Sequence, residues 1–167
     1  QKIGLGVVVC QTGWETVLEN NKLAFTLEFV TRSRFIAPTA FLTSMTPAAF
    51  VDKLFANAGF TPSSNDRTAA INLFGSATTS ADTTARSRAL RLVAENATLA
   101  QQESNRAFVL MQYFGYLRRN PNDPPDADYT GYDFWLGKLN QFNGNYANAD
   151  MVKAFITSTE YRHRFGP

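Results

Sequence analysis

The sequence predicts an all-α protein of about six to seven helices, which form two related helical units around a shared core with little or no sheet. Three observations lead to this class. Hydrophobic residues recur at helical spacing, no segment of convincing length alternates between apolar and polar residues, and similar segments recur at an interval of 65 residues. Hydrophobic residues make up 44% of the chain and aromatic residues 13%, enough for a packed globule.

The helical pattern begins after a short valine stretch at 7–9. Apolar residues then line one face of a long helix over about 14–29. Thr46 and Pro47 predict the start of the next helix, because a capping hydroxyl is followed by proline in the first turn, and Gly59 predicts its end. Further helices are expected at about 64–74, 86–96, 105–118, 131–142 and 149–164, of which 105–118 is the most apolar.

An internal repeat supports this organisation. Pairs of similar residues open comparable helical segments at equal intervals, namely Ala24-Phe25, Ala89-Leu90 and Ala154-Phe155. We interpret the chain as the tail of one unit at 1–46, a helical unit at 47–99 and another helical unit at 105–167.

The charge balance argues against nucleic acid as a partner. The net charge is +2 and no run of basic residues appears, whereas a nucleic-acid binder needs a basic stripe. Two short basic groups are interpreted as solvated helix faces; they are Arg86, Arg88 and Arg91, and Arg162, His163 and Arg164. Charged residues are only 18% of the chain, a composition that is common in extracellular proteins.

No apolar run approaches the roughly 20 residues that a membrane-spanning helix needs, so no membrane insertion is expected. The segment 3–10 is too short for the core of a signal peptide, and the chain begins with Gln1, so we expect a fragment or processed part of a longer protein. The lone Cys10, next to valines, is expected to be a buried and inert thiol.

The proline-rich loop after the most apolar helix is the strongest candidate for a cation site. It places closely spaced carboxylates and an amide before and within the next predicted helix, at Asn122, Asp123, Asp126, Asp128 and Asp133. Calcium prefers six to eight oxygen ligands of this kind. The alternative is a stiff surface turn in which Asp128 or Thr130 caps the next helix.

Aromatic side chains beside this and a later polar loop suggest a second kind of site. Tyr129, Tyr132 and Tyr146 are the tyrosines expected to be exposed, and such rings can stack on glycans. Most other aromatics, including Phe114 and Trp135, are expected in the core. No glycine-rich phosphate loop, metalloprotease helix or nucleophile elbow appears, so no catalytic residue is assigned and no enzyme is expected.

Three stretches together resemble a bacterial family. They are Tyr113-Phe114-Gly115-Tyr116-Leu117-Arg118-Arg119-Asn120-Pro121, then Gly131-Tyr132-Asp133-Phe134-Trp135, then Ser158-Thr159-Glu160-Tyr161. Their order is similar to that of the domain of unknown function 4214, although the turn at 120–128 is longer here. The resemblance implies a non-enzymatic module of large secreted or surface-layer-like bacterial proteins, in which such modules often occur in tandem.

The same motifs suggest a structural ion pair. Glu160 is expected near the C-terminus of the last helix, where the helix dipole disfavours a negative charge. A cationic partner would offset this, and Arg118 or Arg119 is the expected partner.

The leading functional hypothesis is a structural or interaction module at the bacterial cell surface, which associates with copies of itself or with other surface proteins. The alternative is a carbohydrate-binding or adhesive module that uses the acidic loop, with calcium, and the neighbouring tyrosines. A hydrolase using Asp126 and Asp128 is the third hypothesis.

Overall fold

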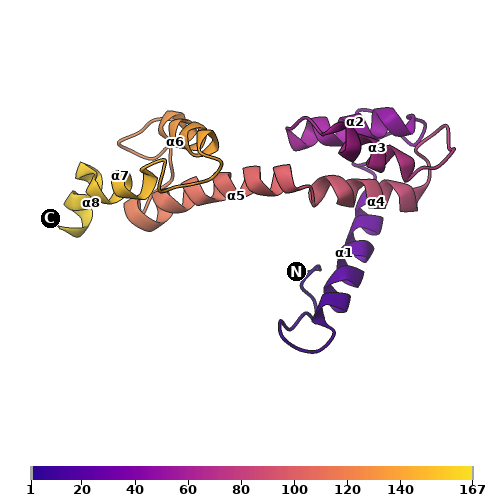
Figure 1. Ribbon diagram of the computed structural model, residues 1–167, viewed down its shortest axis with the longest axis horizontal. Helices are drawn as coiled ribbons and strands as arrows, with labels where there is room; N and C mark the ends of the chain where they lie inside the picture. The colour runs from indigo at the N-terminus through magenta and orange to yellow at the C-terminus, as the bar shows by residue number, and fades with distance from the viewer. Residues whose placement is uncertain (1, 167) are drawn as a thin grey trace. The chain divides into compact units, whose positions relative to one another are not determined.

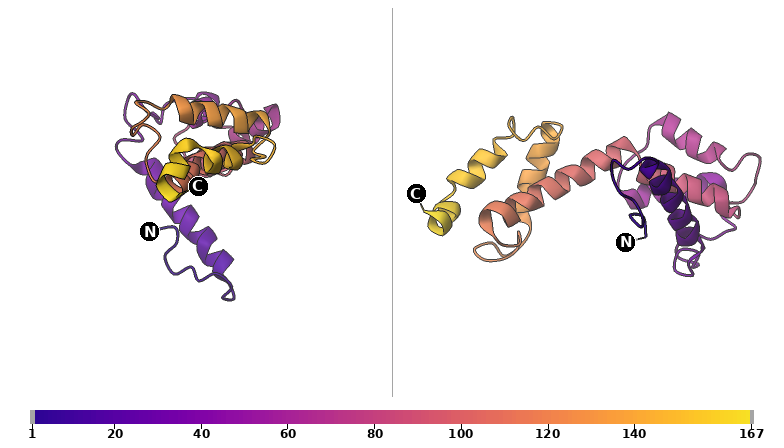
Figure 2. Two further views of the ribbon diagram at one scale, coloured as in Figure 1. Left: turned by 90° about the vertical axis from the view of Figure 1, so that its left-hand side faces the viewer. Right: turned by 90° about the horizontal axis from the view of Figure 1, so that it is seen from below.

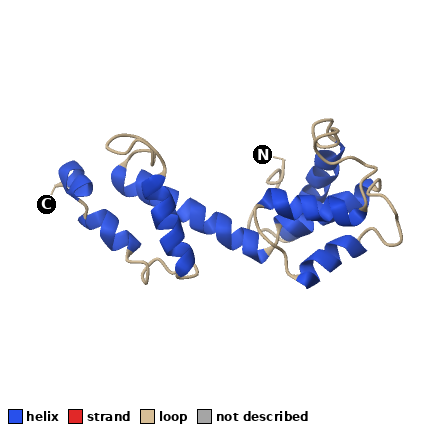
Figure 3. Cartoon of the chain, turned by 90° about the horizontal axis from the view of Figure 1, so that it is seen from above, coloured by secondary structure: helices blue, strands red, loops and turns tan. Residues whose placement is uncertain are grey.

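The computed structural model describes residues 2–166, and Gln1 and Pro167 lie outside the described residues. Every regular element within 2–166 is a helix, so the predicted all-α class is confirmed (Figure 3). There are eight α-helices and one π-helical turn in this range, slightly more than the six to seven expected. They are α1 (Trp14–Thr31), α2 (Pro47–Ala58), α3 (Ser64–Asn72), α4 (Thr83–Ala94), α5 (Ala97–Gln112), η1 (Tyr113–Leu117), α6 (Thr130–Gln141), α7 (Met151–Thr157) and α8 (Thr159–Phe165).

The chain divides into two compact units, Gln1–Leu99 and Ala100–Pro167. The buried hydrophobic residues of each unit form a cluster of their own, at positions 30–93 in the first unit and 109–155 in the second. This differs from the single shared core that the sequence led us to expect. The segment 1–46, expected to be the tail of a preceding unit, lies in the first unit, where α1 packs against α4 (Figure 1).

Local sequence explains where the helices of the first unit begin and end. The Thr46 side chain accepts a hydrogen bond from the backbone of Ala49, and Ser63 caps α3 in the same way. Gly59 ends α2 with a φ of 76°, a left-handed conformation that glycine adopts without strain. The predicted start and end of this helix are therefore confirmed.

Phenylalanine rings fill the core of the first unit. Phe35 and Phe41 stack with their ring centroids 4.5 Å apart, and Phe50 meets both rings edge-on. Such offset and edge-on arrangements are the favoured geometries for aromatic pairs. The connection between α1 and α2 contributes Phe35 and Phe41, so this loop is part of the core.

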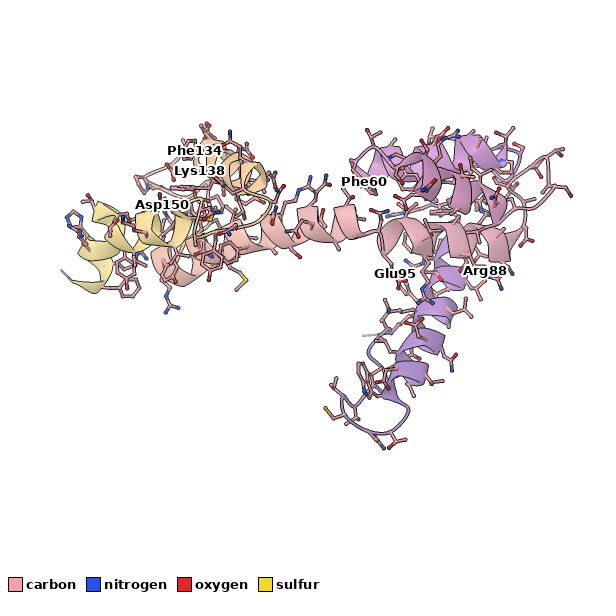
Figure 4. The ribbon with its side chains drawn as sticks, viewed as in Figure 1. Phe60, Arg88, Glu95, Phe134, Lys138 and Asp150 are labelled. Atoms are coloured by element: carbon pink, nitrogen blue, oxygen red, sulfur yellow. The ribbon has the colours of Figure 1, made fainter. Side chains whose placement is uncertain are left out.

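Arg86 on α4 is buried in the same core, with only 1% of its surface exposed. Its guanidinium donates hydrogen bonds to the Phe41 carbonyl at 2.6 Å and the Ser80 carbonyl at 3.1 Å. The interpretation of Arg86 as part of a solvated helix face is therefore wrong, because the two loops that flank α2 and α3 wrap around this side chain and supply its acceptors. Arg88, two residues further on, is exposed (Figure 4).

In the second unit, α5 continues into the π turn η1, which ends at Arg118 in a left-handed conformation with a φ of 53°. Helices α7 and α8 both contact η1. Figure 2 shows the helices of this unit from two further sides. The single helix expected over 149–164 is in fact two helices separated by Ser158. Phe114 is 46% exposed, so its predicted place in the core is wrong.

Cys10 is exposed, contrary to the expectation of a buried thiol, because the segment before α1 contributes no residue to the core. Among residues 2–166 no helix is long and apolar enough to cross a membrane.

Candidate functional site

Arg119 is the centre of the polar interactions in the second unit. It follows η1 directly, and only 7% of its side chain is exposed. Its guanidinium binds the Glu160 carboxylate through two hydrogen bonds, from Nε to Oε1 at 2.7 Å and from Nη2 to Oε2 at 3.0 Å. This two-point geometry suits the planar guanidinium and gives strong, directional hydrogen bonds.

The remaining donors of Arg119 bind the acidic loop. Nη2 donates to Asp126 Oδ2 at 2.7 Å, and Nη1 donates to the carbonyls of Asn120, Pro121 and Asp123 at 3.0–3.2 Å. Hydrogen bonding to Glu160 first, and then to Asp126, raises the pKa of Arg119 despite the opposing effect of burial. The arginine therefore ties the loop 120–126 to the start of α8.

Glu160 reaches Arg119 because the chain breaks at Ser158. The Ser158 hydroxyl accepts a hydrogen bond from the backbone of Tyr161 and so starts a new helix, which places Glu160 in its first turn. The expectation that Glu160 lies near a helix C-terminus is therefore wrong, and the dipole of α8 favours its charge. Of the two arginines considered, the structure brings Arg119 to Glu160 and leaves Arg118 exposed.

The acidic loop does not gather its oxygens around one point. Asp123 accepts hydrogen bonds from the backbone and side chain of Asn120, and Asp128 accepts one from the backbone of Thr130 at 2.8 Å. The hydrogen bonds from Thr130 lower the pKa of Asp128, which lies just before Tyr129, the N-cap residue of α6. Asn122 and Asp133 are exposed. Within residues 2–166, no group of three acidic, histidine or cysteine side chains is placed to hold a metal ion.

The three candidate tyrosines make two different sets of aromatic contacts. Tyr129 and Tyr132 meet edge-on with ring centroids 6.1 Å apart, and the Tyr132 hydroxyl donates to the Arg106 carbonyl. Tyr146 stacks on Phe108 instead, at 5.2 Å. Tyr129 and Tyr146 are about half exposed and Tyr132 is partly buried.

A small pocket lies beside the ion pair of Arg119 and Glu160. It has a volume of about 180 Å³, and its polar lining comes from Tyr113, Arg119, Ser158 and Glu160, with Trp135 among the apolar residues. Tyr113 is only 3% exposed, and its hydroxyl makes no hydrogen bond to any described residue. Tyr113 belongs to the stretch that resembles the family, but no role could be predicted for it because its place at the pocket depends on the π turn.

These features define the second unit as a small helical module stabilised by a buried arginine–glutamate pair. Residues 93–165 match the model of the domain of unknown function 4214, the family that the sequence motifs resemble. The comparisons with curated proteins and with solved structures gave no match.

Proposed function

We propose that the family-matched part of the chain is a non-enzymatic interaction module of a secreted or cell-surface bacterial protein, which associates with copies of itself or with other surface proteins. The proposal is supported by the combination of a fixed framework and exposed aromatic side chains on it. The Arg119 interactions hold the loop and α8 together, so the residues between them keep a defined surface.

The observation that carries the proposal is the number of large apolar side chains on the surface of this unit. Phe134 on α6 is 61% exposed and lies one helical turn from Lys138 (Figure 4). Aromatic and methionine side chains are enriched at protein interfaces, where they supply most of the binding energy. Those exposed here include Met111, Phe114, Tyr129, Phe134, Tyr146 and Phe165.

Self-association is tested by measuring mass against concentration with light scattering or sedimentation. We expect the mass of the chain to rise with concentration, and Phe134→Ser and Phe114→Ser to reduce the rise. Leu5→Ser is the matched control, because Leu5 is 74% exposed and lies outside the family match. A strictly monomeric chain at high concentration would exclude self-association and leave other surface proteins as the partners to examine.

Glycan binding is a second candidate function, and the pocket beside Arg119 favours it. An indole ring at a pocket with hydroxyl and carboxylate groups is a combination that can contact both the apolar face and the hydroxyls of a sugar. The pocket uses Trp135 and Tyr113, so it differs from the platform of Tyr129, Tyr132 and Tyr146 that the sequence suggested.

This candidate is tested with a glycan panel and tryptophan fluorescence. A Trp14→Phe background leaves Trp135 as the only indole. We expect a saturable change for at least one glycan, weakened by Tyr113→Phe and unchanged by Tyr146→Phe. Silence across a broad panel would remove glycan binding from consideration.

A further inference from the structure

The first unit contains two adjoining apolar pockets that share the rings of Phe29, Phe35 and Phe41. One, of about 320 Å³, continues toward Leu54 and Leu90, and the other, of about 290 Å³, ends at arginines. Pockets of roughly 300–1,000 Å³ are typical of small-molecule sites. An unfilled apolar pocket of this size forfeits dispersion contacts along its walls, so an apolar ligand that occupies it stabilises the unit.

The charged groups that lie over the rings of Phe29, Phe35 and Phe41 are cations. Lys53 Nζ lies 5.5 Å from the centroid of Phe41, and the guanidinium carbon of the buried Arg86 lies 5.4 Å from that of Phe35. Among residues 2–166 Arg86 donates only to neutral acceptors and its Nε has no partner, and burial lowers its pKa. Neither pocket has an acidic residue in its lining. The positive charge behind the rings is therefore not balanced by a carboxylate.

Two arginines line the second pocket, and they differ in whether their guanidinium groups already bind a carboxylate. Arg32 lies 5.0 Å over the ring of Phe29 and binds the Glu28 carboxylate at 3.1 Å. Arg34 is exposed at the same pocket and makes no side-chain hydrogen bond or ion pair with a residue of 2–166. The Arg34 guanidinium can therefore bind an anion at the edge of this apolar pocket.

We propose that the pocket formed around Phe29, Phe35 and Phe41 binds a single-chain carboxylate, an anionic amphiphile of the fatty-acid type. The alkyl chain occupies the apolar pocket between the rings and Leu54, and the carboxylate lies at Arg34. The charges favour an anion over a neutral or cationic ligand with the same chain, because every charged side chain at these rings other than Glu28 is positive. All residues that line this site belong to the first unit, whereas the side chains of the interaction surface proposed above belong to the second unit.

The first experiment compares ligands that share one chain and differ in charge. Laurate below its micellar concentration is titrated into the full chain by calorimetry, beside dodecanol and dodecyltrimethylammonium. We expect saturable binding of laurate, about tenfold weaker binding of dodecanol and none of the cation, because a hydrogen-bonded charge pair contributes about one decade of affinity. Equal affinity for all three ligands would overturn the proposal.

Two pairs of variants locate the ligand. Arg34→Ala is expected to weaken laurate about tenfold without affecting dodecanol, and Arg88→Ala, an exposed arginine away from the pocket, is the control. Ala58→Phe places a ring in the pocket and is expected to abolish binding of both ligands, whereas Ala56→Phe, on the exposed side of the same helix, is expected to leave both unchanged. Circular dichroism melts check that each variant folds. If Ala58→Phe does not fold, the comparison of Arg34→Ala with Arg88→Ala decides the test.

A third experiment distinguishes binding of a single ligand molecule in the pocket from attraction of the protein to a charged membrane surface. Flotation with vesicles that carry an anionic phospholipid measures attraction to a charged bilayer. Saturable binding of monomeric laurate that Arg34→Ala weakens about tenfold supports the pocket. Binding to vesicles without saturable binding of monomeric laurate would overturn it, as would an Arg34→Ala protein that binds laurate as well as the unchanged chain.

Discussion

Arg119 and Glu160, 41 positions apart in the chain, are joined by two hydrogen bonds between a largely buried guanidinium and a carboxylate in the first turn of α8. The pair connects the end of the π turn to the last helix. Asp126 and three loop carbonyls complete the coordination of the arginine, so one side chain fixes three segments of the second unit.

Arg119→Ala is expected to destabilise the second unit by about 2–3 kcal/mol, because it removes the hydrogen bonds of Glu160, Asp126 and three loop carbonyls while leaving both carboxylates partly solvated. Arg119→Lys is expected to recover only part of this loss, since an ammonium group lacks the planar fork that binds both carboxylate oxygens. The measurement is urea unfolding followed by circular dichroism, with hydrogen exchange to assign the loss to residues 100–166.

Arg118→Ala is the control for this prediction. Arg118 is adjacent in sequence and exposed, so its replacement is expected to change the free energy of unfolding by less than about 0.5 kcal/mol. Equal effects of the Arg118 and Arg119 substitutions would contradict the role assigned to the buried pair.

Gly131→Ala is expected to destabilise the second unit by about 1–3 kcal/mol through overpacking. A Cβ atom at Gly131 would lie 2.8 Å from the Tyr113 hydroxyl, and the Tyr113 ring is held against Phe155 and Arg119. Tyr113→Phe removes the clashing oxygen, so the double variant should regain most of the lost stability. Thermal melts of the two single variants and the double variant measure this coupling, and strictly additive losses would argue against the contact.

The free energy of unfolding of the first unit is expected to fall as the pH drops below about 4.5, the ordinary pKa of a glutamate side chain. Hydrogen bonds from Arg91 and then Lys22 lower the pKa of Glu19. Partial burial acts to raise the pKa of Glu95, but bonds from Lys22 and Arg91 together outweigh it. Because the folded state holds these carboxylates ionised more strongly than the unfolded state, the stabilisation is present above this pH and is lost as they protonate.

The pH prediction is measured by urea unfolding at pH 7 and pH 3. Glu19→Gln and Glu95→Gln should each reduce the difference in stability between the two pH values, and high salt should weaken the effect at pH 7. Glu15→Gln is the control, since Glu15 is exposed and forms none of the ion pairs seen among residues 2–166. An unchanged pH dependence in both test variants would refute the role of this charge network.

Calcium is expected to shift the melting temperature by less than about 1 °C, because a ligand that does not bind the folded state does not stabilise it. Asp123 and Asp128 already accept hydrogen bonds from nearby groups, and Asp126 pairs with Arg119. The measurement is a pair of melts with calcium and with chelator, together with calorimetry. A calcium-dependent rise that Asp126→Asn/Asp128→Asn abolishes would instead establish a cation site in this loop.

The sequence by itself determined the helical class, many helix boundaries and the family that residues 93–165 match. Spacing of apolar residues and local signals such as Thr46-Pro47 and Gly59 act over a few residues, so they can be recognised without knowing the rest of the fold. The family motif also identified Arg119 and Glu160 as partners before their distance was known, although Arg118 remained an equal alternative.

Only the tertiary structure decided which charges are buried and which aromatics are exposed. Arg86 and Arg88 are two residues apart on one helix, yet loops 41–45 and 76–80 enclose the first and leave the second in solvent. Likewise, the π turn that begins at Tyr113 buries that ring and leaves Phe114 exposed, and Ser158 starts the helix that brings Glu160 to Arg119. Burial depends on segments that are far away in the chain. The hydrophobic pattern along one helix does not indicate where those segments pack.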